Sequence, residues 1–401
     1  MTASRMSGVC MVVGALVPWG ATWGTPLDAQ GPYAGIGEIL ARSVADGRIA
    51  GAVAGVARDG RTEYLTAVGV QSLESGAPMT ERSLFRVYSM TKAITAVAVM
   101  ILHEEGRFEL ADPASLWLPE LADVRVLQPD GSTRPPVRPI TIEHLLLHTA
   151  GFSHRTSSEY REAAVRSRSI PLDQFIRNIA QVPLRFDPGE GYLYSEASTV
   201  LGRLVEVVSG MRFDEFLQAR VLEPLGMTDT SFWVEPEDRA RLTTVYRQTD
   251  GGGVSPYEIE ELPFTERPAL LEGAVGLVST VPDFLRFGQM LAGGGELDGV
   301  RILRESTVRT MTRNGLPESI LATRRGGSGW GLGNVSVVVD EAAAGSGARA
   351  GEYRWDGSAG TEFWVDPESR TVLVTMWQSA PANPDRLRQR ITEIVREAPS
   401  R

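Results

Sequence analysis

Ser89 and Lys92 are the residues of this chain whose types and spacing most clearly suggest chemistry. They stand three positions apart, between a strand-like run over residues 83–87 and a long apolar run over residues 93–102. In a helix this spacing places both side chains on one face, one turn apart. A serine hydroxyl is a weak nucleophile until a nearby base accepts its proton, and a lysine amine that has been removed from water can be that base. The pair therefore predicts a serine nucleophile activated by lysine.

Lys92 is also the only lysine in the sequence. Lysine and arginine together number 40, so the other 39 are arginine. Arginine supplies positive charge elsewhere in the chain, but a guanidinium group does not lose its proton in a protein. An S-x-x-K spacing also arises by chance, and serine caps helices for purely structural reasons. The lone lysine is therefore the observation that favours a catalytic role.

Tyr194 is a candidate partner for this pair. The stretch 188–196 indicates a turn that leads into a helix, and a tyrosine at such an entrance can project into a cleft. A nearby ammonium group would make its phenol ionise below the usual pKa of about 10. The alternative is a buried tyrosine whose hydroxyl bonds a carbonyl group, which is the commoner arrangement.

A second candidate region is 353–361, which indicates a strand that runs into small residues. Gly357 would let a substrate approach the backbone closely. The backbone N–H of Ser358 would then face the N–H of Ser89 across a substrate carbonyl, which is the arrangement of an oxyanion hole. A β-bulge or a turn without chemistry is the alternative.

The composition argues against several classes of function. Hydrophobic residues make up 42% and charged residues 22% of the chain, as in ordinary globular proteins. The net charge of −10 argues against a nucleic-acid partner or a basic membrane-binding patch. The sequence holds neither a glycine-rich phosphate loop nor a G-x-S-x-G elbow. His144 and His148 have a metal-like spacing, but leucines fill the gap and no acid stands there, so we expect no metal and no other cofactor.

Residues 1–29 are predicted to be a secretory signal. Arg5 precedes an apolar run over 9–17 that is too short to span a bilayer. A cut near Ala29 would remove Cys10, the only cysteine, and would leave a chain with no thiol chemistry and no membrane span. We therefore expect a periplasmic or secreted protein. A disordered or mistranslated extension is the alternative.

Strand-like segments stand at both ends of the chain, with helical segments between them. Residues 50–56 and 62–68 form a hairpin pattern around an Asp-Gly turn, and four further strands are expected within 335–377. The run after Lys92 is apolar on all sides, which predicts a helix in the centre of the core. These patterns favour one α/β domain that both ends of the chain build together.

The domain boundaries follow from the same patterns. We assign 30–105 and 266–401 to the α/β domain. Residues 106–265 lack a long alternating run and are predicted to form a mostly helical insertion. Within it, the polar and glycine-rich stretch 236–265 is expected to be a mobile loop.

Five stretches together resemble the serine β-lactamase and penicillin-binding-protein superfamily, and most closely the class C-like branch that holds family VIII carboxylesterases. They occur in the family's order and are 87–92, 141–152, 187–195, 277–284 and 360–367. None is specific alone, but their combination is very specific and extends over nearly all of residues 35 to 395. The resemblance implies an α/β (α+β) fold with an antiparallel sheet flanked by helices and an all-α insertion.

The resemblance also implies roles for the candidate residues. Ser89 resembles the nucleophile, Lys92 the lysine of the S-x-x-K motif, and Tyr194 the tyrosine of the family's Y-x-N motif. The N–H groups of Ser89 and Ser358 would form the oxyanion hole. The residues expected around the substrate are Tyr88, Glu196, Trp355 and Gly357.

Two positions depart from the β-lactamase pattern. Glu196 replaces the asparagine of Y-x-N, and Trp355 replaces the lysine of K-T-G. These two family residues help to hold a β-lactam, so their loss weakens the antibiotic interpretation, and a W-x-G sequence resembles the esterases. Glu196 would either pair with Lys92 inside the cleft or point away and support the helix entrance.

The preferred hypothesis is a serine hydrolase that cleaves small carboxylic esters through an acyl-enzyme, with lactones or acyl-transfer donors as related substrates. The alternatives are a β-lactamase or D-Ala-D-Ala carboxypeptidase, and a penicillin-binding-like module that binds without turnover. The expected partner is a small-molecule ester, and the motifs carry no information on oligomeric state.

Overall fold

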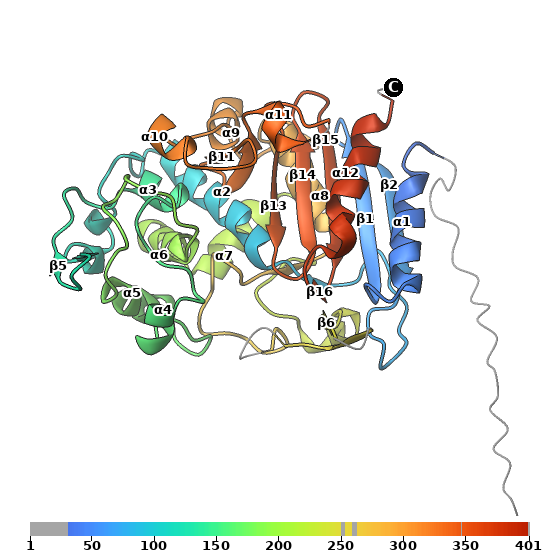
Figure 1. Ribbon diagram of the computed structural model, residues 1–401, viewed down its shortest axis with the longest axis horizontal. Helices are drawn as coiled ribbons and strands as arrows, with labels where there is room; N and C mark the ends of the chain where they lie inside the picture. Colours follow the sequence, from blue (N-terminus) through green and yellow to red (C-terminus); the bar gives the residue numbers. More distant parts are fainter. Residues whose placement is uncertain (1–30, 250–252, 259–262, 346, 400–401) are drawn as a thin grey trace, which may run out of the picture.

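A seven-stranded antiparallel sheet forms the centre of the computed structural model, which describes residues 31–249, 253–258, 263–345 and 347–399 (Figure 1). Its strand order is β11-β12-β13-β14-β15-β1-β2. These strands are β1 (Gly51–Arg58), β2 (Arg61–Gly69), β11 (Ser328–Gly331), β12 (Val335–Val338), β13 (Tyr353–Gly357), β14 (Thr361–Asp366) and β15 (Thr371–Trp377). Because β1 pairs with β15, both ends of the chain build this sheet, which confirms the predicted fold class.

The predicted hairpin is β1–β2, and its turn residues Asp59 and Gly60 have φ values of 48° and 78°. Such positive φ values at two successive positions are what a tight hairpin turn requires. Strands β12 to β15 were also predicted. The edge strand β11 was missed, because its sequence Ser-Gly-Trp-Gly carries no alternating pattern.

Helices cover both faces of the sheet. On one face lie α1 (Ala34–Ala45) and α12 (Leu387–Glu397), packed against alternate residues such as Ala52 and Ala54. On the opposite face α8 (Val281–Ala292) packs near Val53 and Phe363. The central strands β1, β14 and β15 are thus buried on both sides, which accounts for their nearly continuous apolar runs.

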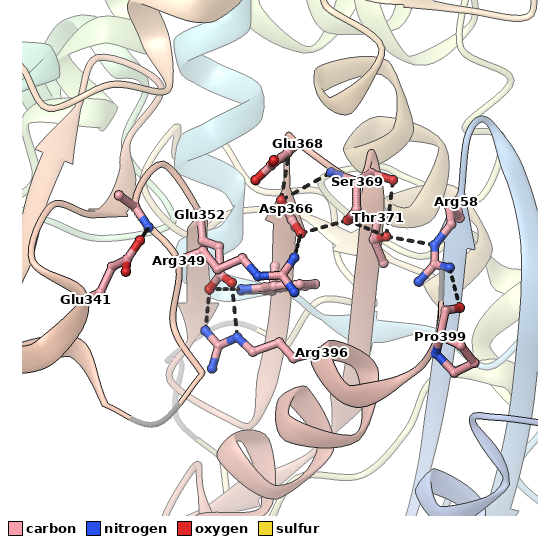
Figure 2. Close-up of polar contacts among 12 residues, drawn as sticks. Arg58, Glu341, Arg349, Glu352, Asp366, Glu368, Ser369, Thr371, Arg396 and Pro399 are labelled. Carbon is pink, nitrogen blue, oxygen red and sulfur yellow. Dashed lines mark hydrogen bonds and ion pairs between the residues drawn. The ribbon is translucent and has the colours of Figure 1, made fainter. Parts of the chain in front are cut away.

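Polar contacts join the C-terminal helix to the sheet (Figure 2). Arg396 on α12 donates hydrogen bonds to both carboxylate oxygens of Glu352, which also accepts one from the indole of Trp364 at 3.1 Å. Beyond β15, Arg58 on β1 donates to the Pro399 carbonyl at 3.1 Å. This last bond ties the two ends of the chain to each other.

The remaining large helices gather at one end of the sheet, on the left of Figure 1. They are α2 (Thr91–Glu104), α3 (Ile142–Leu146), α4 (Ser158–Glu162), α5 (Leu172–Ala180), α6 (Ala197–Ser209) and α7 (Phe213–Leu217). As predicted, α2 is a core helix, buried from Thr91 to Leu102, and it packs against α6 and α7. Gly210 ends α6 in the left-handed conformation that glycine favours.

Shorter elements complete the described part of the chain. The helices are α9 (Glu305–Met311), α10 (Glu318–Leu321) and α11 (Glu341–Ala344). The short strands are β3 (Phe85–Arg86), β4 (Val126–Leu127), β5 (Thr133–Arg134), β6 (Tyr246–Gln248), β7 (Val254–Pro256), β8 (Val278–Ser279), β9 (Glu296–Leu297), β10 (Val300–Arg301) and β16 (Ser379–Ala380). No helix among the described residues is long and apolar enough to cross a membrane.

Two segments differ from their sequence predictions. The stretch 236–265 is not simply a loop, because β6 pairs with β7 and with β16 near the C-terminus. Of the strand expected over 83–87, only the two-residue strand β3 forms, and it pairs with β8. Residues 1–29, the predicted signal, and Gly251 and Gly252 lie outside the described residues.

Candidate active site

Ser89 lies in a tight turn between β3 and α2. The turn is a 3-10 segment over Tyr88–Met90, and Tyr88 holds a left-handed φ of 43°. A bulky residue seldom adopts this conformation, and such strain is concentrated at functional sites. The sharp turn leaves Ser89 less buried than Tyr88 and Met90 on either side of it. The fold therefore exposes one hydroxyl at the start of a buried helix.

Lys92 reaches Ser89 from the first turn of α2, as the spacing predicted. Its Nζ lies 3.4 Å from Ser89 Oγ and donates a hydrogen bond to the Ala274 carbonyl at 2.8 Å. The side chain is fully buried, and this desolvation lowers the pKa of the amine to about 7. The amine is therefore about half neutral at pH 7 and largely neutral at alkaline pH, where it has a lone pair for the serine proton.

Tyr194 lies beside both residues, but its electrostatics differ from the expectation. Lys92 Nζ stands over the face of the Tyr194 ring, 4.6 Å from its centroid, while Trp355 Nε1 donates to the phenol oxygen at 3.2 Å. Burial raises the pKa of this phenol, and its hydrogen bonds to Ser89 and Trp355 only partly offset the rise. The predicted easier ionisation is wrong, because desolvation of the buried phenol outweighs the hydrogen bonds that lower its pKa.

The N–H groups of Ser89 and Ser358 are available as oxyanion donors. In the described part of the chain, neither donates a hydrogen bond to a protein acceptor outside its own helix or strand. Strand β13 ends against the segment ahead of Ser89, since Thr361 Oγ1 donates to the Val87 carbonyl at 3.2 Å. Ser358 is exposed and directly follows Gly357, the last residue of β13. Two available N–H donors beside a nucleophile are what a tetrahedral oxyanion needs.

Gly357 has a packing role in addition to the one predicted for it. A Cβ atom added at this position would lie 2.5 Å from the Val87 carbonyl oxygen and 2.2 Å from Thr361 Oγ1. The close approach is therefore between two segments of the protein's own backbone. It brings the end of β13 against the turn that carries Ser89.

This contact predicts the effect of Gly357→Ala. The added methyl group must push β13 away from the Ser89 turn, and overpacking of this kind costs about 1–3 kcal/mol of stability. We expect kcat to fall about tenfold or more, because small displacements of aligned groups are costly. Ester hydrolysis and thermal unfolding measure the two effects. Gly288→Ala on α8, whose added Cβ would lie 2.5 Å from the Val372 side chain, is the matched control for a clash away from the Ser89 turn. Unchanged kcat in a folded Gly357→Ala protein would contradict this role.

The other predicted substrate-binding residues have different fates. Tyr88 is buried, with its ring 6.0 Å from that of Phe264, so its side chain is withdrawn from a substrate. Trp355 is half-buried and supports Tyr194 through its indole N–H. Glu196 is buried at the entrance of α6 and accepts a hydrogen bond from Thr199 at 3.4 Å. No ion pair joins it to Lys92 within the described part of the chain, although its charge raises the pKa of that amine.

Sequence reasoning missed an aromatic wall around Tyr194. Trp330 on β11 lies 4.5 Å from Trp355 and 5.9 Å from Tyr194 between ring centroids, and Tyr192 lies 5.7 Å from Trp330. His148 packs under Tyr194 at 4.8 Å. The available signal in the sequence was that His148 lies within 141–152, one of the five family-like stretches. The wall makes this side of the site apolar.

The histidines have structural roles. His144 Nδ1 accepts a hydrogen bond from the Thr141 N–H and completes the cap of α3. His148 Nδ1 accepts one from the Ser195 N–H at 3.3 Å, and burial keeps its pKa well below the ordinary value. The Nδ1 atom of each ring is thus engaged in a local hydrogen bond.

A family model described as "Beta-lactamase" matches residues 36–395. The chain belongs to the beta-lactamase family. Among curated relatives, the esterase EstB of Burkholderia gladioli is 35% identical over 85% of this chain and 88% of its own length. A lovastatin esterase of Penicillium rubens is 32% identical over 70% of this chain and 72% of its own.

A solved structure supports the same conclusion. EstCE1, described as a hydrolase with promiscuous acyltransferase activity, superposes with a TM-score of 0.80 and 26% identity, covering 91% of this chain and 98% of the other. Within the beta-lactamase family, the likeness to these proteins places the chain near the family VIII carboxylesterases. The chain is a serine hydrolase of carboxylic esters, as the sequence predicted.

Proposed function

We propose that Ser89 is the nucleophile and Lys92 its general base. One observation carries the assignment: a buried amine, its pKa near 7, stands 3.4 Å from the serine hydroxyl at the entrance of α2. A base whose pKa lies near the working pH transfers protons efficiently in both directions. The Ala274 carbonyl holds one N–H of this amine, which turns the lone pair toward Ser89.

The reaction then runs in two halves. Ser89 Oγ attacks the ester carbonyl while its proton passes to Lys92, and the N–H groups of Ser89 and Ser358 stabilise the oxyanion. The resulting ammonium returns the proton to the leaving alcohol, with the phenol of Tyr194 relaying it. In the second half, water gives its proton to Lys92 and attacks the acyl-enzyme, and Ser89 departs with that proton. Tyr194 acts as a neutral donor throughout, because burial keeps its phenol protonated.

The aromatic wall supports esters with apolar groups as substrates. Tyr192 and Trp355 are partly exposed beside Tyr194, with the buried Trp330 packed against them, and burying a substrate's hydrocarbon groups against such rings is favourable. Trp355 also stands where β-lactamases carry a lysine, so a substrate carboxylate finds no ammonium there. These features favour esters over the alternatives, a β-lactamase or D-Ala-D-Ala carboxypeptidase.

A substrate panel tests this choice. We expect p-nitrophenyl esters to be turned over. For a chromogenic cephalosporin, kcat/KM should be lower by up to about 10²-fold, since a missing charged hydrogen bond costs about 1.5–3 kcal/mol. The matching p-nitroanilide amide should not be cleaved. Cephalosporin turnover equal to that of the best ester would favour the β-lactamase alternative. Absence of any turnover, together with failure of a fluorophosphonate probe to label the protein, would favour a non-catalytic binding module.

Acyl transfer is a second candidate function. The structurally similar EstCE1 is a hydrolase with promiscuous acyltransferase activity, and the apolar wall of this protein would hold an alcohol near the acyl-enzyme as well as it holds an ester. Adding an alcohol acceptor during ester turnover measures the partition between transfer and hydrolysis. Formation of the new ester would support transfer, and exclusive hydrolysis would exclude it.

We also propose that the protein is secreted or periplasmic. The short apolar run within residues 1–29 supports this, because it has the proportions of a signal peptide. Protein isolated from its native cell is expected to start near Gln30. N-terminal sequencing that found Met1 or Thr2 on the active protein would contradict the proposal.

A further inference from the structure

Three hydrogen bonds join the segment 272–277 to α2, close to the Lys92 amine. Lys92 Nζ donates to the Ala274 carbonyl at 2.8 Å, and Thr95 Oγ1 donates to the Gly273 carbonyl at 2.8 Å. At the end of the segment, the Leu277 N–H donates to Thr91 Oγ1 at 3.2 Å. The position of the Ala274 carbonyl, and with it the direction of the Lys92 lone pair, depends on how this segment is held.

Glu272 holds the start of the segment. Its side chain is completely buried, and Arg166 binds both carboxylate oxygens, through Nε and, at 2.8 Å, through Nη2. The Glu272 carbonyl also accepts the N–H of Gly276 at 2.9 Å, which closes a turn around Ala274. Arg166 follows α4 in the helical region, so this ion pair fastens that region to the chain that returns toward the sheet.

Buried bidentate pairs of this kind are expensive to form. Their desolvation consumes most of the Coulomb gain, and removing one partner leaves an uncompensated buried charge. Such a charge next to Lys92 acts on the amine. Glu272 stabilises the ammonium form, and Arg166 neutralises Glu272.

Several other charged or titratable groups face Lys92, and they come from separate elements. Glu196 and Arg155 act on its charge with opposite signs, the first raising and the second lowering its pKa. The rings of Tyr194, His148 and His154 lie around it, and the charge of Lys92 in turn lowers the pKa of both histidines. Unlike these groups, Glu272 lies in the turn that presents the Ala274 carbonyl.

We propose that Arg166 and Glu272 form a positioning pair for Lys92, which holds the Ala274 turn and neutralises a carboxylate that would otherwise favour the ammonium form. The proposal rests on the function assigned above, in which Lys92 is the general base. This role requires no contact between either side chain and the substrate. Their role is to keep the amine oriented and uncharged at the working pH.

The pH dependence of ester hydrolysis tests the pair, because the two single variants should shift its midpoint in opposite directions. In wild type, kcat/KM for a p-nitrophenyl ester should fall on acidification with a midpoint near 7. Arg166→Gln leaves the buried carboxylate uncompensated, so the midpoint should rise by about one pH unit, as a charge at moderate distance predicts. Glu272→Gln leaves the arginine charge instead, so the midpoint should fall by about the same amount. The double variant should return it close to the wild-type value.

Matched controls separate this role from a structural one. The exposed pair Arg185–Glu159, with a 2.6 Å contact in the same region, provides Arg185→Gln and Glu159→Gln, which should leave the midpoint unchanged. If Arg166→Gln does not fold by circular dichroism, Arg166→Lys replaces it. That variant keeps the charge and loses the bidentate contact, so we expect an unchanged midpoint with a lower kcat.

The outcomes separate failure of the positioning pair from failure of the proposed function. Midpoints that stay at the wild-type value, or that move in the same direction in both single variants, overturn the positioning pair. If Arg166→Lys is used instead, a shifted midpoint or an unchanged kcat also overturns the positioning pair. A wild-type profile without an acidic limb overturns Lys92 as the base, and so rejects the proposed function itself.

Discussion

Replacing Ser89 by alanine is expected to lower kcat for ester hydrolysis by about 10³- to 10⁶-fold, the usual loss when a covalent nucleophile is removed. The hydroxyl is the group placed to form the acyl-enzyme, since Lys92 and Tyr194 are placed to move protons. The fold should persist, because Ser89 is only partly buried and the turn depends on backbone geometry. Steady-state turnover of a p-nitrophenyl ester measures the loss.

Ser306→Ala is the matched control, because Ser306 is exposed on α9, outside the candidate site. It should hydrolyse the ester at the wild-type rate and should react with a fluorophosphonate probe. Ser89→Ala should not react with that probe. If the Ser89→Ala protein keeps kcat within about tenfold of wild type, another residue is the nucleophile.

Replacing Lys92 by arginine is expected to lower kcat/KM by at least about 10²-fold, the low end for losing acid–base assistance. Arginine keeps the positive charge but cannot give up its proton, since its pKa exceeds about 12. The planar guanidinium would also crowd a buried position built for one amine between Ser89 and the Ala274 carbonyl. The change thus separates a base from a fixed charge.

The pH dependence supplies the second readout. Burial lowers the pKa of Lys92 to about 7, and in the proposed mechanism the active form is the neutral amine. Activity of wild type should therefore rise as the pH increases through about 7 and level off above it. The arginine variant should lack this rise, with circular dichroism showing that it folds. A folded Lys92→Arg enzyme with near-parental activity would mean that Lys92 contributes charge alone.

Local patterns in the sequence determined the chemistry of the first turn of α2. The i, i+3 spacing of Ser89 and Lys92 depends only on helix geometry, so the contact between them could be predicted without any tertiary information. The same holds for the β1–β2 hairpin, whose Asp-Gly turn encodes its own backbone conformation. The motif order also identified the fold, because five weak signals in the family's order are together very specific.

Tertiary structure decided how these groups behave. Tyr194 was expected to ionise easily, but burial against Trp355 and Lys92 raises its pKa, and burial is a property of the packed chain rather than of neighbouring residues. Gly357 was assigned to substrate approach, and its missing Cβ also makes room for the Val87 carbonyl.

The residues that contact or influence Lys92 could not be predicted from sequence patterns. The Ala274 carbonyl is 182 residues away along the chain, and it is a backbone atom that every residue carries. The bond from Arg166 to Glu272 spans 106 residues. Such contacts depend on how α2, the helical region and the returning chain pack together, so only the folded protein shows that Lys92 is desolvated and bonded to the Ala274 carbonyl.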